Sequence, residues 1–152
     1  MRRVVVDANA IDPLINTPGA YEATRSAIDD GQLELLFTHI TVEELAETPD
    51  LDRRSHLLLI LIDLGRIIPT GAFVLDYSRL NFARLNDDTE AFEAFRSGNI
   101  DHTRDALIAA TAQYEKCAMV TFDKRLTARA RDRGVEVLTP TELLREIGFT
   151  GI

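Results

Sequence analysis

The sequence has few of the features on which secreted and membrane-bound proteins rely. Its 152 residues include a single cysteine, Cys117, so no disulfide can form within the chain. The longest strictly apolar run covers residues 57–62 and is far too short to span a bilayer. Only three valines follow the basic start of the chain, which is shorter than the apolar segment of a signal peptide. We therefore expect a cytoplasmic protein, in a reducing compartment and without a membrane partner.

Several common catalytic and cofactor-binding patterns are missing too. Neither G-x-x-x-x-G-K nor G-x-G-x-x-G occurs, so no glycine-rich phosphate loop is expected. The three histidines are far apart in the sequence, which disfavours a zinc site. A phosphatase with an aspartyl nucleophile usually has Asp-x-Asp after its first strand, whereas here the second position is Asn9. A phospho-accepting receiver domain needs a lysine at the end of a late strand, and neither of the two lysines has that place.

The composition is that of an ordinary globular protein, and predicted strands alternate with predicted helices along the chain. Apolar residues make up 45% and charged residues 28%, and the length suits one domain over residues 1–152. Short apolar runs predict strands over residues 3–7, 33–37, 66–69, 118–122 and 135–138. Helices are expected over residues 20–30, up to residue 45, and over 51–64, 105–116, 123–133 and from 140 onward. This alternation predicts an α/β protein with a central parallel sheet covered on both faces.

Two parts of the chain give a weaker or ambiguous signal. Residues 72–99 are hard to interpret; residues 80–85 look helical, and Thr89 can cap a further helix. The net charge is −8, which by itself argues against a nucleic-acid partner. However, Arg125, Arg129 and Arg133 are spaced to share one face of a helix, with Lys124 beside them. This basic stripe fits either RNA phosphates or a solvated, salt-bridged helix surface.

Four acidic residues are predicted to meet at one edge of the sheet. Asp7 directly follows the first strand, and Glu44 lies in the first turns of the helix after the second strand. From Asp105 a helix of about twelve residues descends roughly 18 Å. The next strand climbs back roughly 16 Å to Asp123. Since ligands of open parallel sheets bind beyond the carboxyl ends of the strands, this edge is the expected site.

Such a group of carboxylates would repel itself unless cations were bound. Oxygen ligands suit Mg²⁺ or Mn²⁺, and two such ions can activate water and stabilise the leaving oxygen in phosphodiester cleavage. Taken singly, each acid also has a structural interpretation. Asp7 could cap a turn, Thr41 to Glu44 fits a capping box, Asp105 could complement a helix dipole, and Asp123 could be an N-cap. Their coincidence at one edge favours the catalytic interpretation.

Four motifs in this order resemble those of the PIN-domain nucleases. They are Val-Val-Asp7-Ala-Asn9, Ile40-Thr-Val-Glu-Glu44-Leu45, the segment from Asp105 to Ala112, and Val120-Thr-Phe-Asp123-Lys-Arg-Leu126. The segment from Gly134 to Pro140 is also similar, so the resemblance runs from Val4 to about Leu144. It implies a three-layer α/β/α sandwich and magnesium- or manganese-dependent endonucleolytic cleavage of RNA.

The resemblance also implies roles for single residues. The family's acids match Asp7, Glu44, Asp105 and Asp123, as catalytic residues and metal ligands. Asn9 and Thr121 match residues that support the first and last of these aspartates. Ala8 departs from the Thr or Ser often found there, which removes a hydroxyl but no metal ligand.

Further expectations concern partners. Small single-domain members are typically toxins of toxin–antitoxin pairs, the VapC-like group, so an antitoxin protein and a homodimer are expected alongside the RNA substrate. Two alternatives remain: a PIN-like scaffold that binds RNA or protein without cleavage, and an RNA-processing nuclease that is not a toxin. A scaffold would be expected to lose acids from the quartet, and this chain keeps all four.

Overall fold

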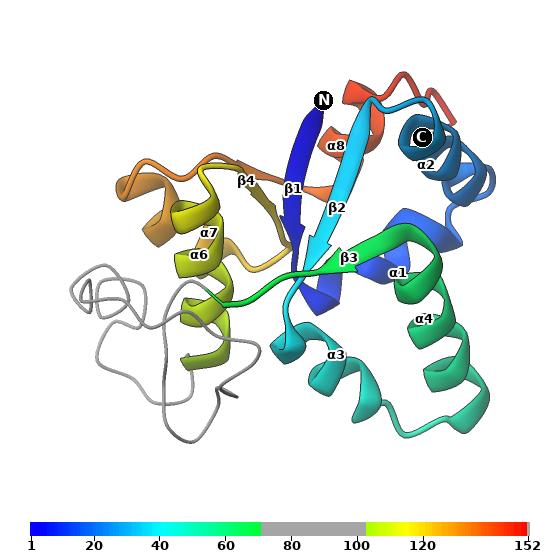
Figure 1. Ribbon diagram of the computed structural model, residues 1–152, viewed down its shortest axis with the longest axis horizontal. Coiled ribbons are helices and arrows are strands. Elements are labelled where there is room, and N and C mark those ends of the chain that lie inside the picture. The colour runs from blue at the N-terminus through cyan, green and yellow to red at the C-terminus, as the bar shows by residue number, and fades with distance from the viewer. Residues whose placement is uncertain (71–102, 152) are drawn as a thin grey trace.

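The computed structural model describes residues 1–70 and 103–151 (Figure 1). The side chains of Ile15 and of residues 103–105 are outside this description. Residues 71–102 and residue 152 also lie outside it. The helices expected within residues 72–99 therefore stay predictions.

Five parallel strands form a single sheet in the described part of the chain. They are β1 Arg2–Val6, β2 Leu33–Phe37, β3 Gly65–Ile67, β4 Ala118–Val120 and β5 Val137–Leu138. The strand order is β3-β2-β1-β4-β5, so the first strand is central. Val5 lies opposite Leu36 on one side and opposite Met119 on the other. The parallel sheet predicted from the alternation of elements is therefore confirmed.

Seven helices flank this sheet within the described residues. They are α1 Ala8–Asn16, α2 Ala20–Asp29, α3 His39–Ala46, α4 Leu51–Leu64, α6 Thr103–Glu115, α7 Lys124–Asp132 and α8 Pro140–Glu146. The bounds of α4 agree with the prediction because Asp50 caps its start through Arg53 N and Gly65 follows its end. No helix of the described chain is long and apolar enough to cross a membrane.

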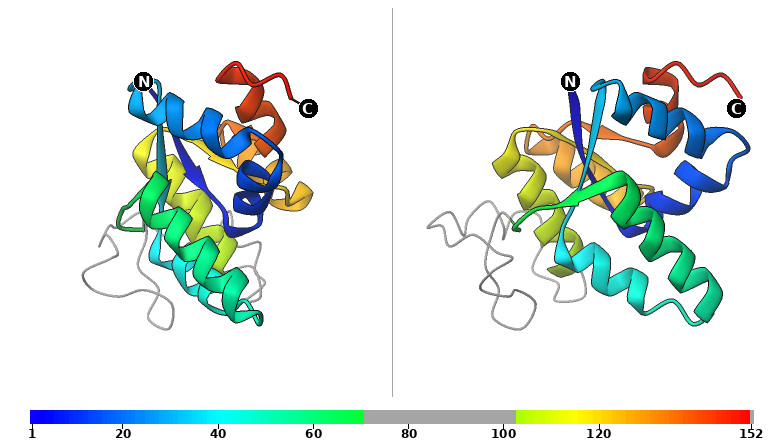
Figure 2. Two further views of the ribbon diagram at one scale, coloured as in Figure 1. Left: turned by 90° about the vertical axis from the view of Figure 1, so that its right-hand side faces the viewer. Right: turned by 45° about the vertical axis from the view of Figure 1, so that its right-hand side comes forward.

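Alternate residues of β1, β2, β4 and β5 pack into two separate cores, which creates the three layers. Val4 and Val6 belong to the core that contains the apolar residues of α1, α2, α4 and α8. Val5 belongs to the core formed with α6 and α7. The two groups of helices lie on opposite sides of the sheet in Figure 1 and in the right-hand view of Figure 2. The three-layer α/β/α sandwich is confirmed, and the apolar runs of the strands reflect burial on both faces.

Helix α3 lies across the carboxyl edge of the sheet. Ile40 enters the core on the α6 side, whereas Leu45 enters the core on the opposite side. The buried hydroxyl of Thr41 donates to the carbonyl oxygen of Val6 at 3.3 Å, which joins the helix to the last residue of β1. Thr38, rather than Thr41, is the N-cap of this helix. The capping-box interpretation of Thr41 and Glu44 is therefore wrong, since both residues lie inside α3.

Other local predictions need correction as well. Helix α1 is not predicted from the sequence, because Pro13 lies in its interior, where it removes a backbone hydrogen bond. Strands β4 and β5 are shorter than expected. β4 ends at Val120. The backbone N–H of the next residue, Thr121, still donates to the carbonyl oxygen of Leu138, whereas its hydroxyl donates to the carboxylate of Asp7.

Candidate active site

Asp7 leaves the end of β1 and is held from three directions. It is 2% exposed. Oδ1 accepts from the backbone N–H of Ala8 at 2.8 Å, which caps α1, and Oδ2 accepts from the Thr121 hydroxyl at 2.8 Å. The backbone N–H of Asp7 donates to the carbonyl oxygen of Val120 at 3.0 Å, which extends the pairing of β1 with β4. The carboxylate is thereby fixed where these two strands end.

Asp123 follows β4 and caps α7. Its Oδ1 accepts from the backbone N–H groups of Arg125 and Leu126 at 2.9 and 3.0 Å. Its own backbone N–H donates to Thr121 Oγ1 at 3.1 Å. Within the described residues, Oδ2 of Asp123 has no hydrogen bond or ion pair, so this oxygen remains available to a ligand.

The hydroxyl of Thr121 is the link between these two aspartates. It is 1% exposed, donates to Asp7 and accepts from the backbone of Asp123. Asn9 joins the same network: its Oδ1 accepts from the backbone N–H of Phe122 at 3.1 Å and lies 3.4 Å from the Thr121 hydroxyl. The structure thus brings Asp7, Asn9, Thr121 and Asp123 into one set of hydrogen bonds.

The other two predicted acids, Glu44 and Asp105, lie on helices α3 and α6. Glu44 is three residues after Thr41 on α3, and residues three apart share a helix face. Asp105 is in the first turn of α6, a helix that contacts α3, and only its backbone is described. Thr41, which the sequence suggested only as part of a capping box, joins α3 to β1 through the hydrogen bond from its hydroxyl to Val6.

The electrostatics of this edge combine acidic side chains with helix N-termini. α1 and α7 begin directly after Asp7 and Asp123, so their positive dipole ends oppose the repulsion between the carboxylates. In the described part of the chain, no three acidic, histidine or cysteine side chains form a ready metal cluster. Asp105, the remaining member of the predicted quartet, falls outside that search. The donor chemistry of Asp7 and Asp123 suits a hard divalent cation.

The basic stripe lies on α7, which begins at Asp123. Lys124 and Arg125 are exposed in its first turn, and Arg133 is exposed at its C-cap. Arg129 differs, because its Nε and Nη2 atoms are enclosed and have no hydrogen-bond partner among the described residues. The interpretation of the whole stripe as a solvated face therefore does not account for Arg129.

The parallel sheet and its acidic edge define a three-layer α/β/α protein with a site at the carboxyl ends of its strands. The family model of the PIN domain matches residues 4–132. The chain belongs to the PIN domain family, whose members are nucleases. The resemblance of the four sequence motifs to this family is thereby confirmed.

Solved structures share this fold at low sequence identity. PAE2754 from Pyrobaculum aerophilum is 18% identical with a TM-score of 0.60, and 98% of each chain is covered. VapBC2 from Rickettsia felis, bound to a DNA fragment from their promoter, is 16% identical with a TM-score of 0.59, over 90% of this chain and 98% of that one. The PIN domain endonuclease Utp24 is 17% identical with a TM-score of 0.58, over 90% and 84%. No curated protein matches the sequence.

Proposed function

We propose that this chain is a metal-dependent endoribonuclease that uses Asp7, Glu44, Asp105 and Asp123. The observation that carries the proposal is the hydrogen-bonded link from Asp7 through Thr121 to Asp123 where β1 and β4 end. A helix cap alone requires neither that link nor the burial of Asp7. Membership of a nuclease family and the likeness to the endonuclease Utp24 support the same reaction class.

The residues divide into ligands and positioning groups. Asp123 uses one oxygen to cap α7 and leaves the other to a cation. Asp7 is held rigidly by Thr121 and by the start of α1. Asn9 and Thr121 position the backbone around Asp123 and are not themselves proposed as ligands. Glu44 and Asp105 would complete the oxygen donors from α3 and α6.

The chemistry of the donors fits Mg²⁺ or Mn²⁺. Bound divalent cations would supply an activated water and stabilise the leaving oxygen of the phosphodiester. The protein's own contribution is to gather the carboxylates in fixed positions and to offset their repulsion with the N-termini of α1 and α7. Because a metal-activated water would be the nucleophile, no side chain has to act as one.

We further propose that the chain is the toxin of a toxin–antitoxin pair. The support is its likeness to the VapC-like group in sequence motifs and to VapBC2 in fold. An antitoxin that covers the acidic edge and a homodimer are proposed on the same likeness. A neighbouring gene for a small, basic DNA-binding protein, whose product forms a complex with this chain and stops cleavage, would establish the pairing. If no such gene is present, the alternative role of an RNA-processing nuclease would be favoured over that of a toxin.

The experiment is RNA cleavage by the purified chain in magnesium, manganese and excess chelator. Cleavage is expected with either metal and not with chelator, and Asp105→Asn should abolish it. Asp132→Asn at the exposed end of α7 is the matched control, because it removes the same charge away from the edge. An Asp105→Asn protein as fast as the parent would overturn the site, and a folded parent that binds RNA without cleavage would favour the scaffold.

A further inference from the structure

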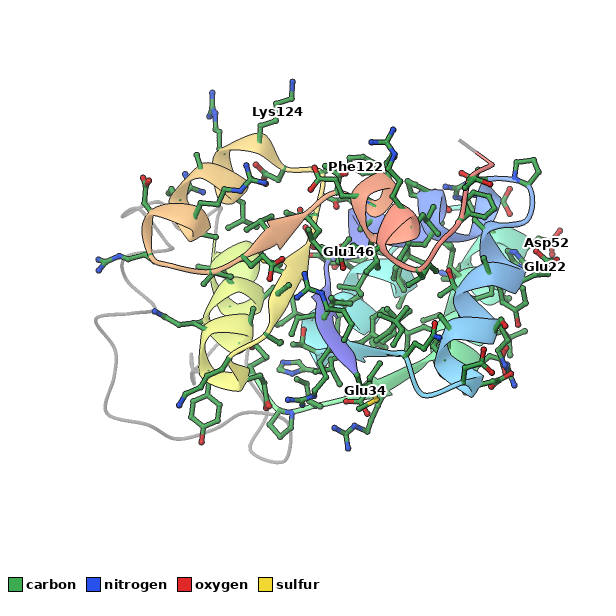
Figure 3. All side chains as sticks on the ribbon, turned by 90° about the horizontal axis from the view of Figure 1, so that it is seen from above. Glu22, Glu34, Asp52, Phe122, Lys124 and Glu146 are labelled. Atoms are coloured by element: carbon green, nitrogen blue, oxygen red, sulfur yellow. The ribbon has the colours of Figure 1, made fainter. Side chains whose placement is uncertain are left out.

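A pocket of about 360 Å³ lies directly beside Asp123, between α7 and the start of α8. The residues that matter for its chemistry are Phe122, Lys124, Thr127, Arg131, Thr139 and Glu142. The sequence stripe of Arg125, Arg129 and Arg133 lies on a different face of α7 and does not line this pocket. In Figure 3, Phe122 and Lys124 lie at the same end of α7. The pocket therefore adjoins the acidic edge without using the predicted metal ligands.

Phe122 presents an aromatic ring to this pocket. It is 45% exposed and belongs to neither core. Its backbone is fixed, because its N–H donates to Asn9 at 3.1 Å and the next residue caps α7. Single exposed apolar residues are common on protein surfaces, but this one follows the site residue Thr121 directly and lines a pocket. An exposed ring in such a place offers a face on which a nucleobase can stack.

The charged residues of the pocket are one hydrogen-bond acceptor, Glu142, and two cations, Lys124 and Arg131. Glu142 is at the third position of α8, and its backbone N–H donates to the Thr139 hydroxyl at 3.1 Å. Its carboxylate makes no reciprocal hydrogen bond within the described residues, although a capping-box glutamate would. Arg131 is held by a 2.9 Å hydrogen bond from Nη2 to the carbonyl oxygen of Val137, and Lys124 is exposed.

We propose that this pocket binds one unpaired nucleobase of single-stranded RNA beside the phosphate to be cleaved, which rests on the proposed function. The base stacks on Phe122, an exocyclic amino group donates to Glu142, and Lys124 and Arg131 face the flanking phosphates. Adenine, cytosine and guanine each carry an exocyclic amino group, whereas uracil presents only carbonyl oxygens outside its ring. A cationic segment of a protein partner could also contact Phe122 and Glu142, but the two adjacent cations oppose it.

The first test uses fluorescence, because the chain contains no tryptophan. Phe122→Trp introduces a sole indole at the pocket, in an Asp105→Asn background that prevents cleavage. Tyr114→Trp, exposed in the last turn of α6, is the matched control. Tetra-adenylate and tetra-cytidylate are expected to quench the indole at position 122 and not the one at 114, and tetra-uridylate to bind more weakly. Equal quenching of the two indoles by RNA would overturn the proposal.

The second test uses cleavage kinetics in the otherwise unaltered chain. Phe122→Ser should raise KM for RNA by about tenfold, Phe122→Tyr should restore the parental KM, and Glu142→Gln should reduce the preference for adenine and cytosine over uracil. Thermal melting of each variant should match the parent, because these side chains are outside the cores. If the parent cleaves RNA and Phe122→Ser has the parental KM, base binding by the pocket is contradicted and the proposed nuclease activity stands. If RNA quenches the indole at position 122 but the parent does not cleave RNA, the proposed nuclease activity is contradicted and base binding by the pocket stands.

Discussion

At the scale of single residues, one side chain can serve as a helix cap and as part of the site. Asp7 and Asp123 are the N-caps of α1 and α7, which was the structural interpretation of each. The cap on α7 uses only one carboxylate oxygen of Asp123, so it does not exclude a metal ligand. The two roles look like alternatives in the sequence because a motif does not show which oxygen is engaged. Local geometry makes them compatible.

The hydroxyl of Thr121 is predicted to be required for this arrangement. Thr121→Val removes the donor to the buried Asp7 carboxylate and the acceptor of the Asp123 N–H, with little change in volume. Loss of a buried hydrogen bond to a charged group should destabilise the fold by about 1–3 kcal/mol and should strongly slow cleavage. Urea denaturation and single-turnover cleavage measure the two effects. Thr121→Ser, which keeps the hydroxyl, should behave as the parent, and equal losses in both variants would contradict the assignment.

At the scale of elements, helix α7 carries basic residues on two different faces. Arg125 and Arg129 lie on one face, whereas Lys124 and Arg131 line the pocket next to α8. Between them, Leu126 and Ala130 are buried in the core shared with α6. The two proposed RNA contacts can therefore be tested separately by mutations on one helix.

The first face is predicted to bind the RNA backbone. Arg129→Ala should weaken RNA affinity for all sequences alike and reduce the log–log salt dependence by somewhat less than one unit, because one phosphate contact is lost. Affinity is measured across a salt series in calcium, with Arg145→Ala on α8 as the control for a lost surface arginine. Cleavage of bound RNA should persist, since no arginine is a proposed ligand. An unchanged slope and affinity would contradict a role of this face in RNA binding.

Sequence patterns predict some elements closely and miss others for physical reasons. Helix α4 is predicted to the residue because an N-cap aspartate and a terminal glycine bound it. Helix α1 is missed because Pro13 is a strong signal against a helix, although Ile11 and Leu14 are buried at helical spacing. Tertiary packing against the sheet outweighs that local cost. The positions of Asp7 and Asp123 result from parallel topology, whereas the linking role of Thr121 and the pocket at Phe122 depend on side-chain directions.

At the scale of the whole molecule, the proposed site would gather four acids in an already acidic chain. The net charge is −8, and the four proposed acids account for half of that value. The N-termini of α1 and α7 oppose their repulsion only in part, because a helix end carries about half a unit charge. Stability of the folded chain should therefore depend on divalent cations.

Thermal melting in chelator and in magnesium tests this charge crowding. Saturation at one hundred times the dissociation constant adds about 2.7 kcal/mol, which corresponds to a rise in Tm of roughly 5–10 °C for a chain of this size. Asp123→Asn should melt higher than the parent in chelator and gain less from magnesium. Asp50→Asn changes the N-cap of α4 in the same way and serves as the control. An equal magnesium-induced shift in parent and Asp123→Asn would contradict the crowding of charge at this edge.

The most direct measurement of the central claim is single-turnover RNA cleavage in magnesium by Asp123→Asn and Asp50→Asn. Asparagine caps a helix about as well as aspartate, so both variants should keep their helices and their fold. The proposed site predicts that Asp123→Asn abolishes cleavage, because a carboxylate ligand becomes an amide, and that Asp50→Asn cleaves at the parental rate. A folded Asp123→Asn protein that cleaves RNA as fast as the parent would contradict the claim that the carboxylates at the ends of β1 and β4 carry out the chemistry.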